Sequence, residues 1–334
     1  MARSSRRDGQ GGLSVRVLVV ALVIQLVLGA AIVYGAVAGF PIIGGGGRSA
    51  KPGDTPSLPA ATPAPRPTAN RFDAAAAYAL AARQVRVGQR PAGSPQLRRL
   101  AEDLRRLLPG GRFEPVGGWP RLRNVIGTLP GTRPAIVVGA HYDTLVKPQG
   151  AVGANNGAAG TAIVVQLARD LRRVKRPPGA PELRFVLFDG EEPAAGLPEE
   201  QPDFYAAGLR GSRAYAARHA AATRAMLLLD YVGNRGLRVP REASSDRALW
   251  ARLRAAAAKV GAGAVFPDAT ETAILDDHTP FLRAGVPAAD LIDWRYPGHS
   301  RADTLDKLSV RSMDAVGEAL AELLLRPGPA RPAH

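Results

Sequence analysis

The sequence predicts an α/β protein with a single mixed, mostly parallel, twisted sheet, helices on both faces, and one transmembrane helix before it. From residue 71 onward, near-continuous apolar runs such as "LRFVLF" alternate with segments of helical periodicity. Strands buried on both faces have such runs, and alternation with helices is typical of parallel sheets. Residues 17–40 form an uncharged apolar stretch, and about 20 such residues span a bilayer.

The N-terminal region predicts a single-pass membrane anchor. Arg3, Arg6, Arg7 and Arg16 precede the apolar stretch, and basic residues favour the cytoplasmic side. Residues 1–16 are therefore expected in the cytoplasm, with the remainder outside the cell membrane. A cleaved signal peptide is the alternative, but its apolar region usually has about 7–15 residues. The length favours an uncleaved anchor at 17–40.

Composition divides the rest of the chain into three parts. Residues 41–70 are rich in Gly and Pro and poor in large apolar residues, so they are expected to form a linker. Residues 71–326 have the apolar periodicity of a folded domain, which we expect to be catalytic. Residues 327–334 are expected to be a short tail.

The elements of this domain follow from apolar spacing and from residues that start or stop helices. Ser94 starts an amphipathic helix that Pro-Gly-Gly ends, and the Ser pair at 244–245 starts another helix. Helices are predicted at 71–88, 94–111, 158–174, 208–220, 244–261 and 309–325, and strands at 123–129, 135–143, 183–190, 225–233 and 288–293.

The charge and the absence of cysteine limit the possible functions. The formal charge is +15, from 44 basic and 29 acidic residues, but the Arg residues are scattered and form no basic helix with interleaved aromatics. We therefore expect no nucleic-acid partner. With no cysteine, any metal site must use His and carboxylate ligands.

Polar residues cluster where the predicted strands end. In sheets of this kind, sites form beyond the carboxyl ends of the strands. Zinc accepts His and carboxylate ligands and leaves positions open for water or substrate. Four strand ends supply such side chains, which predicts a metal site at this edge; they are His141 and Asp143, then Asp189, Glu191 and Glu192, then Asp230, then Asp293 and His299.

Six separated motifs then fall in the order and spacing of a known family. They are "AHYDT", "GANNGAAGTA", "FDGEE", "GLRGSRAYA", "LLLDYVG" and "GHSRADTLDKL". Over residues 75–326 the chain resembles the secreted zinc aminopeptidase family, which includes the glutaminyl-peptide cyclotransferases. The segments 276–293 and 191–219 resemble the cyclase branch. The resemblance implies a zinc exopeptidase-like fold and action on peptide N-termini.

The resemblance also implies residue roles. Glu191 would be the general acid and base, and Glu192 and His299 would bind metal. His141 and Asp230 would hold a second metal in the aminopeptidases, whereas in the single-zinc cyclases Asp230 would be a catalytic hydrogen-bonding acid. Asp143 would orient His141.

Three further positions can be compared with the pattern of the family. Asp276 matches a catalytic carboxylate of the cyclases, although a role in capping the following helix is equally open. Asn156 stands where the family has the Asp that binds metal in both branches. A neutral amide can ligate one ion weakly but cannot bridge two dications. Gly298 stands where many cyclases have Trp, and Trp294 lies nearby in the sequence.

These features predict one Zn²⁺ rather than two, bound by residues among His141, Asn156, Glu192, Asp230 and His299. The expected function is a membrane-tethered, extracytoplasmic enzyme that cyclises N-terminal glutamine, with Glu191, Asp230 and Asp276 catalytic. Two alternatives stay open: a zinc aminopeptidase on the same scaffold, and a catalytically silent binding domain. The expected partners are peptide or protein N-termini and, through the anchor, the membrane.

Overall fold

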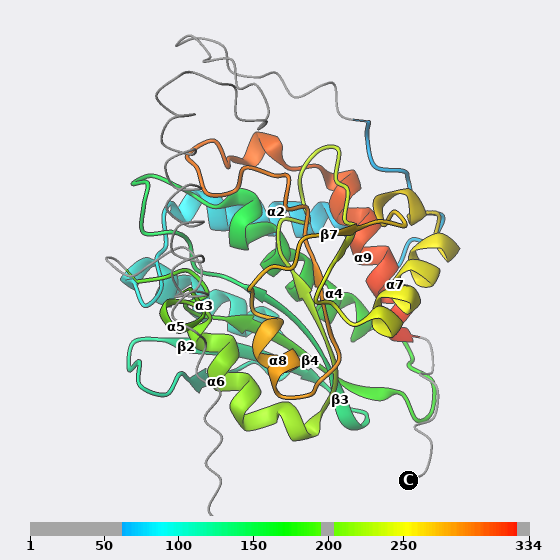
Figure 1. The fold of residues 1–334 in the computed structure, drawn as a ribbon, viewed down its shortest axis with the longest axis horizontal. Coiled ribbons are helices and arrows are strands. Elements are labelled where there is room, and N and C mark those ends of the chain that lie inside the picture. Colours follow the sequence, from blue (N-terminus) through cyan, green and yellow to red (C-terminus); the bar gives the residue numbers. More distant parts are fainter. Residues whose placement is uncertain (1–61, 195–203, 326–334) are drawn as a thin grey trace, which may run out of the picture. The chain divides into compact units, whose positions relative to one another are not determined.

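A six-stranded mixed sheet forms the centre of the domain in the computed structural model, which describes residues 62–194 and 204–325 (Figure 1). The strand order is β1-β2-β4-β3-β5-β8. The last four strands in this order run parallel, and β1 and β2 are antiparallel at one edge. The strands are β1 (Arg112–Pro115), β2 (Arg123–Leu129), β3 (Thr132–His141), β4 (Pro181–Phe188), β5 (Thr223–Leu229) and β8 (Ala288–Leu291).

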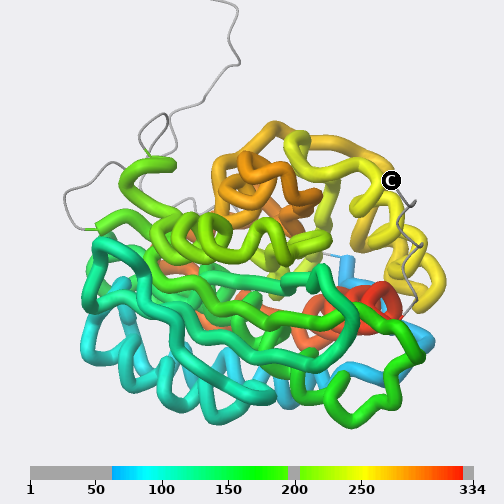
Figure 2. Tube along the Cα trace, turned by 90° about the horizontal axis from the view of Figure 1, so that it is seen from below, coloured from blue at the N-terminus to red at the C-terminus, as the bar shows by residue number. Residues whose placement is uncertain are grey.

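Helices cover both faces of this sheet (Figure 2). On one face, α6 (Arg210–His219) and α8 (Thr279–Arg283) enclose a small core around Phe188, Tyr215 and Phe281. The larger core lies on the other face, under α2 (Ala74–Val87), α3 (Pro95–Leu107), α4 (Gly160–Leu171), α7 (Arg247–Lys259) and α9 (Val310–Leu325). All eight residues of β4 are buried, as expected for a strand covered on both faces.

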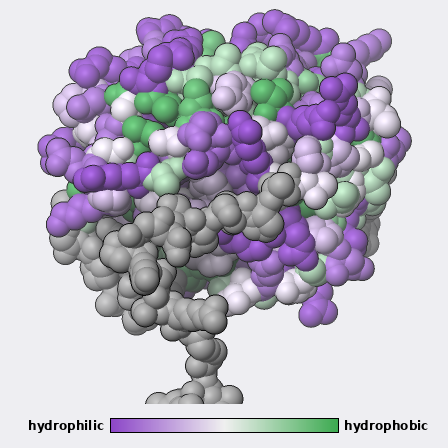
Figure 3. All heavy atoms as spheres, turned by 90° about the horizontal axis from the view of Figure 1, so that it is seen from above, coloured by the Kyte–Doolittle hydropathy of each residue, from purple (hydrophilic) through white to green (hydrophobic). Residues whose placement is uncertain are grey.

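Three helix starts follow from side chains that accept hydrogen bonds from the first turn. Asp73 caps α2, Ser94 caps α3 and Asp246 caps α7. Such residues satisfy backbone N–H groups that have no partner within the helix. The chain's large apolar residues then go inside; over the described ranges only four are exposed, namely Val87, Trp119, Trp294 and Val310. On the face shown in Figure 3, hydrophilic side chains predominate.

The order of the central strands indicates where a ligand site is expected. From β3 the chain crosses to β4 on one side, and β5 then lies on the other side of β3. Ligands bind at such a reversal of strand order, beyond the carboxyl ends of the strands. His141 is the last residue of β3, and the acidic residues after β4 and β5 flank it.

The predicted sheet, its mostly parallel character and its two helical layers are confirmed. Several short elements were not predicted: β1, α5 (Phe204–Ala207), α8, and a two-stranded parallel sheet of β6 (Arg241–Glu242) and β7 (Thr270–Glu271). They are too short to show a period of their own. At residue 158 the predicted helix starts differently, because Ala154–Ala159 form a kinked turn, η1, before α4 begins.

The predicted anchor at 17–40 lies outside the described residues, as do residues 1–16 and 327–334. No helix within 62–194 and 204–325 is long and apolar enough to cross a membrane. The end of the predicted linker contacts the domain: Ala64 is buried, and the Thr68 N–H donates to the Val260 carbonyl at 2.9 Å.

Candidate active site

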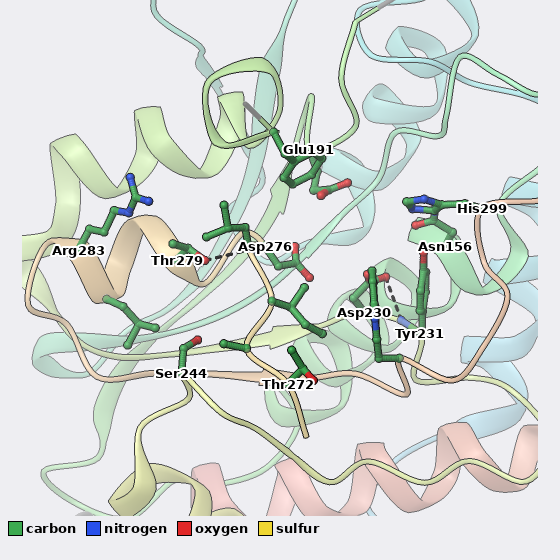
Figure 4. Close-up of a pocket in the computed structure, with 16 residues that line it drawn as sticks. Asn156, Glu191, Asp230, Tyr231, Ser244, Thr272, Asp276, Thr279, Arg283 and His299 are labelled. Carbon is green, nitrogen blue, oxygen red and sulfur yellow. Dashed lines mark hydrogen bonds between the residues drawn. The ribbon is translucent and has the colours of Figure 1, made fainter. Parts of the chain in front are cut away.

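A pocket of about 870 Å³ opens at the carboxyl edge of the sheet (Figure 4). Glu191 and Asp230, from the ends of β4 and β5, line it together with Asp276, Asn156 and His299. The apolar part of the lining comes mainly from Phe204, Ile274, Leu275, Leu282 and Trp294. Strand ends far apart in the sequence therefore meet in one cavity, as the sequence predicted.

The three carboxylates of "FDGEE" point to different surroundings. Asp189 accepts hydrogen bonds from the Arg123 N–H at 2.9 Å and the Tyr142 hydroxyl at 3.1 Å. Glu191 lines the pocket, and Glu192 lies beside Asn156. The chain therefore uses Asp189 to fix β2 to β4, whereas the two glutamates face the site.

Asp293 is also used away from the pocket. It accepts hydrogen bonds from Asn234 Nδ2 at 3.0 Å and from the Arg238 N–H at 3.1 Å, and it pairs with Arg295 at 2.8 Å. It therefore holds the loop after β8, and its position at a strand end does not make it part of the site.

Glu192 is the link between Asn156 and His299. Asn156 Nδ2 donates to Glu192 Oε1 at 2.6 Å, and the same oxygen lies 3.9 Å from His299 Nε2. On the other side, His141 Nε2 lies 3.5 Å from Asp230 Oδ1, and His141 Nδ1 lies 4.0 Å from Glu191 Oε2. The five residues proposed as metal ligands thus lie together, in two groups.

Asp143 stabilises this arrangement through contacts with both glutamates and with His141. Its two carboxylate oxygens accept hydrogen bonds from the Glu191 N–H at 3.3 Å and the Glu192 N–H at 3.2 Å. Its Oδ1 lies 3.6 Å from His141 Nδ1. Asp143 therefore fixes the backbone of both glutamates and faces the imidazole that it was predicted to orient.

The kink at Asn156 and Gly157 brings the amide of Asn156 to the site. The backbone N–H groups of Asn155 and Asn156 donate to the Asp303 carboxylate, at 2.8 and 2.9 Å. Gly157 follows with φ +91°, and a Cβ there would lie 2.8 Å from the Asp143 carbonyl oxygen and 3.1 Å from His141 Cε1. Only glycine allows this close approach of backbone and imidazole.

Burial and like charges raise several pKa values in the pocket. Burial raises the pKa of Glu191 well above its usual value, and the charge of Glu192 adds to this. Burial raises the pKa of Glu192 to about 8, partly offset by His141. Burial and Asp230 raise the pKa of Asp276 to about 7. Carboxyls crowded in this way resist ionisation, and a bound cation would relieve the repulsion.

The acidic neighbours of His141 raise its pKa. Burial alone would lower it, but the nearby carboxylates of Asp143, Asp230 and Glu191 raise the pKa of His141 well above its usual value. Within the described part of the chain, neither ring nitrogen of His141 has a hydrogen-bond partner. A buried imidazole with both nitrogens unused is a candidate metal ligand.

The donor types fit one divalent cation better than two. Two ligands of a tetrahedral zinc with bonds of about 2.0–2.1 Å lie about 3.3–3.4 Å apart, near the His141–Asp230 separation of 3.5 Å and shorter than the Glu192–His299 separation of 3.9 Å. Yet no group of three His, Asp or Glu side chains within the described ranges is arranged as a metal site. Asn156, whose Nδ2 lies 2.6 Å from Glu192 Oε1, contributes an amide and not a carboxylate. Asn156 can offer one neutral oxygen after its amide turns, but no charge to share between two ions.

Asp276 contributes its carboxyl to the pocket, and it does not cap α8. The residue before α8 is His278, and no side chain caps that helix. Asp276 Oδ1 instead accepts from the Asp277 N–H at 2.5 Å, while Thr279 Oγ1 accepts from the Asp276 N–H at 3.1 Å. The Asp276 side chain therefore caps no N–H group of α8, and it lines the pocket.

His278 lies behind the pocket wall and contacts Ser244, which lines the pocket. It is fully buried; its Nε2 lies 2.9 Å from Ser244 Oγ and 3.3 Å from Glu242 Oε2. Glu242 also accepts from the Ile274 N–H at 3.0 Å. This network ties the wall segment to the loop after β6.

Tyr231 is a site residue that sequence reasoning missed. Its ring lines the pocket, lies parallel to Trp294 with ring centres 6.1 Å apart, and meets His299 edge-on. A Cβ on Gly298 would lie 2.4 Å from Tyr231 Cζ. The space beside Gly298 is therefore filled by the ring of Tyr231, which follows β5 in the chain. The signal in the sequence was the aromatic residue directly after Asp230.

The sheet topology and the carboxylate-lined pocket at its point of strand reversal define the class: an α/β enzyme of exopeptidase architecture. The model of peptidase family M28 matches residues 124–324. This chain belongs to that family.

Named relatives and structures agree with this assignment. Glutaminyl-peptide cyclotransferase of Bos taurus is 26% identical over 242 residues, which span 62% of this chain and 67% of the relative. Aminopeptidase YwaD of Bacillus subtilis is 26% identical over 200 residues, 55% of this chain and 39% of the relative. The glutaminyl cyclase of an Acidobacteriales bacterium has a similar structure, with a TM-score of 0.66 and 29% identity, covering 79% of this chain and 98% of that one.

Proposed function

We propose that this protein is a zinc-dependent glutaminyl-peptide cyclotransferase that uses one metal ion. The observation that carries the proposal is the convergence of Glu191, Asp230 and Asp276 in one pocket beside the pair formed by Asn156 and Glu192. The cyclotransferases among the similar proteins and structures support this reaction.

The reaction needs one proton to move and no water. The N-terminal amine attacks the side-chain amide carbon of the substrate glutamine, a new C–N bond forms, the original amide C–N bond breaks, and its nitrogen leaves as ammonia. Glu191 accepts the proton from the attacking amine and delivers it to the departing nitrogen, which is general acid–base catalysis. Asp230 and Asp276 hold the amine and amide nitrogens by accepting hydrogen bonds from them.

Glu192, His299 and the Asn156 side-chain oxygen would hold the zinc ion, with His141 and Asp230 adjacent. When bound, zinc would polarise the carbonyl of the substrate amide. Tyr231 and Trp294 would contact the substrate beside His299, and the apolar wall of Ile274 and its neighbours would exclude water. Exclusion of water favours cyclisation over hydrolysis.

The second candidate is hydrolysis by an aminopeptidase. The spacing of His141 Nε2 and Asp230 Oδ1 at 3.5 Å favours it, because these two groups would hold a second ion. The neutral Asn156 counts against it, since a two-ion site needs a bridging carboxylate. A catalytically silent binding domain is the third candidate, and it would bind no zinc.

Ammonia release separates these candidates. Zinc-equilibrated protein is incubated with a Gln-initiated peptide, and ammonia and the cyclised product are measured. In parallel, chromogenic amino-acid amides report hydrolysis. The cyclase predicts ammonia and no chromophore. Chromophore without ammonia would establish the aminopeptidase, and neither product with zinc bound would reject both.

The proposal includes the location. The apolar residues 17–40 and the Arg residues before them support an enzyme tethered in the cell membrane with its pocket outside the cytoplasm. A protease added to intact cells would then remove the catalytic domain, whereas an internal enzyme would be protected.

A further inference from the structure

The pocket has acidic groups around its centre and a cation at one end. Arg283, the last residue of α8, lines the pocket. Figure 4 shows it at the end opposite Asn156 and His299, with Glu191 and Asp276 between them. A substrate that places its N-terminal amine among the carboxylates therefore extends along the apolar wall towards a guanidinium.

Arg283 is exposed, and its guanidinium lies over an aromatic ring. Arg283 Cζ lies 3.6 Å from the centre of the Tyr205 ring, and a guanidinium stacked on a ring keeps its in-plane N–H groups for other acceptors. Among the described residues, no carboxylate lies within ion-pair distance of Arg283. A side chain fixed in advance loses less entropy when it binds a ligand.

The helix that carries Arg283 is itself anchored. Phe281 is fully buried, packed against Phe188 and Tyr215 with ring centres 6.2 and 6.0 Å away. Val286 follows and is buried in the same cluster. The position of the guanidinium relative to the pocket is therefore set by the core of the domain.

We infer that Arg283 is a specificity residue that binds a carboxylate of the substrate. The preferred substrates are short peptides whose chain carries an anion beyond the N-terminal residue on which the enzyme acts. The carboxylate is either the C-terminus of a short peptide or an acidic side chain. Arg binds carboxylates through two parallel N–H···O bonds. This inference deepens the proposed function and rests on it.

Arg213 provides a matched control. It contacts the same ring, with Cζ 5.1 Å from the Tyr205 centre, and its Nη1 donates to the Tyr205 and Ala206 carbonyls, each at 3.1 Å. It is absent from the pocket lining. Arg213→Gln therefore removes the same charge near the same aromatic ring without removing a group that faces the substrate.

The experiment compares four peptides that begin with Gln and have equal length. One is amidated and neutral, one is the same peptide as a free acid, and two are amidated with Glu at the second or third position. Steady-state ammonia release is measured for the wild type, Arg283→Gln and Arg213→Gln. The free-acid and Glu arms identify which carboxylate is bound.

The expected result is a lower KM, by about 10-fold, for at least one carboxylate peptide relative to the neutral peptide in the wild type, which corresponds to about 1.4 kcal/mol. Arg283→Gln removes the difference and Arg213→Gln keeps it. The effect falls on KM rather than kcat because the contact is made equally in the ground and transition states. It also weakens in 1 M NaCl, since salt screens exposed charges.

The inference is overturned if the wild type shows no preference, if the preference persists in Arg283→Gln, or if both variants lose it equally. If no peptide is turned over, the proposed function fails. Calorimetric binding of the same four peptides then tests Arg283 separately, by the same comparison of dissociation constants among the three proteins.

Discussion

The substitution Asn156→Asp tests whether residue 156 is a metal ligand. Without metal, it replaces the 2.6 Å hydrogen bond from Asn156 Nδ2 to Glu192 Oε1 by two carboxylates in contact. Above a pH of about 8, where Glu192 is ionised, losing a buried hydrogen bond to this charged group costs about 1.5–3 kcal/mol, and the repulsion adds to this. The metal-free variant should therefore be less stable than the wild type by about 3 kcal/mol.

In the presence of zinc, Asn156→Asp should stabilise the protein instead, because the new carboxylate is an anionic ligand. Loss of an interaction that only supports a ligand changes metal affinity about 10–100-fold, so gain of a ligand should tighten binding by about 100-fold. At equal free zinc above both dissociation constants, this adds about 2.7 kcal/mol of stabilisation. For a domain of this size the melting temperature should rise by about 5–10 °C more on zinc addition than in the wild type.

The assay is thermal unfolding with and without zinc, combined with competition against a chelator. Asn155→Asp is the control. It makes the same change one residue away, but Asn155 Nδ2 donates to Asn234 Oδ1 at 3.1 Å and does not contact Glu192. It should lose stability and gain no zinc affinity. An unchanged zinc affinity in Asn156→Asp would refute the assigned ligand position, and an equal gain in Asn155→Asp would show a nonspecific charge effect.

Three further predictions concern catalysis, stability and pocket shape. Glu191→Gln should lower kcat by about 10²–10⁴-fold with zinc content retained; full activity would exclude Glu191 as the acid and base. Burial raises the pKa of Glu242, but hydrogen bonds from His278 and the Ser244 backbone outweigh this and lower it to about 2. The ionised form therefore stabilises the fold above about pH 4.5, and this contribution is lost as pH falls towards 2. Glu242→Gln should cost about 2 kcal/mol in urea unfolding at pH 7 and much less near pH 2; a cost independent of pH contradicts this. Gly298→Trp should collide with Tyr231 and destabilise the protein by about 1–3 kcal/mol, and the further change Tyr231→Gly should recover part of the loss in the same assay.

The sheet and the strand-end residues could be predicted because they depend on local patterns. Buried runs such as 183–188 show their ends through the polar residues that follow, and parallel strands bring those ends to one edge. Which strand-end side chain enters the pocket could not be predicted in this way. Asp189 and Asp293 also follow predicted strands, but their side chains bind Tyr142 and Arg295 and do not line the pocket.

The pocket wall and its specificity groups depended on tertiary contacts. Tyr231 fills the space beside Gly298, and its backbone φ is +45°. A positive φ is uncommon in a non-glycine residue, and no sequence pattern predicts it here. Arg283 is one of many arginines in this chain. Only its contact with Tyr205 and its place in the pocket distinguish it.

The most direct test of the central claim is the zinc content of the purified full-length protein. After equilibration with zinc and removal of the excess, elemental analysis should find one zinc per chain, and Glu192→Gln should reduce it to near zero. A chain that binds no zinc, or two ions with equal affinity, would contradict a site in which Asn156 leaves room for a single cation.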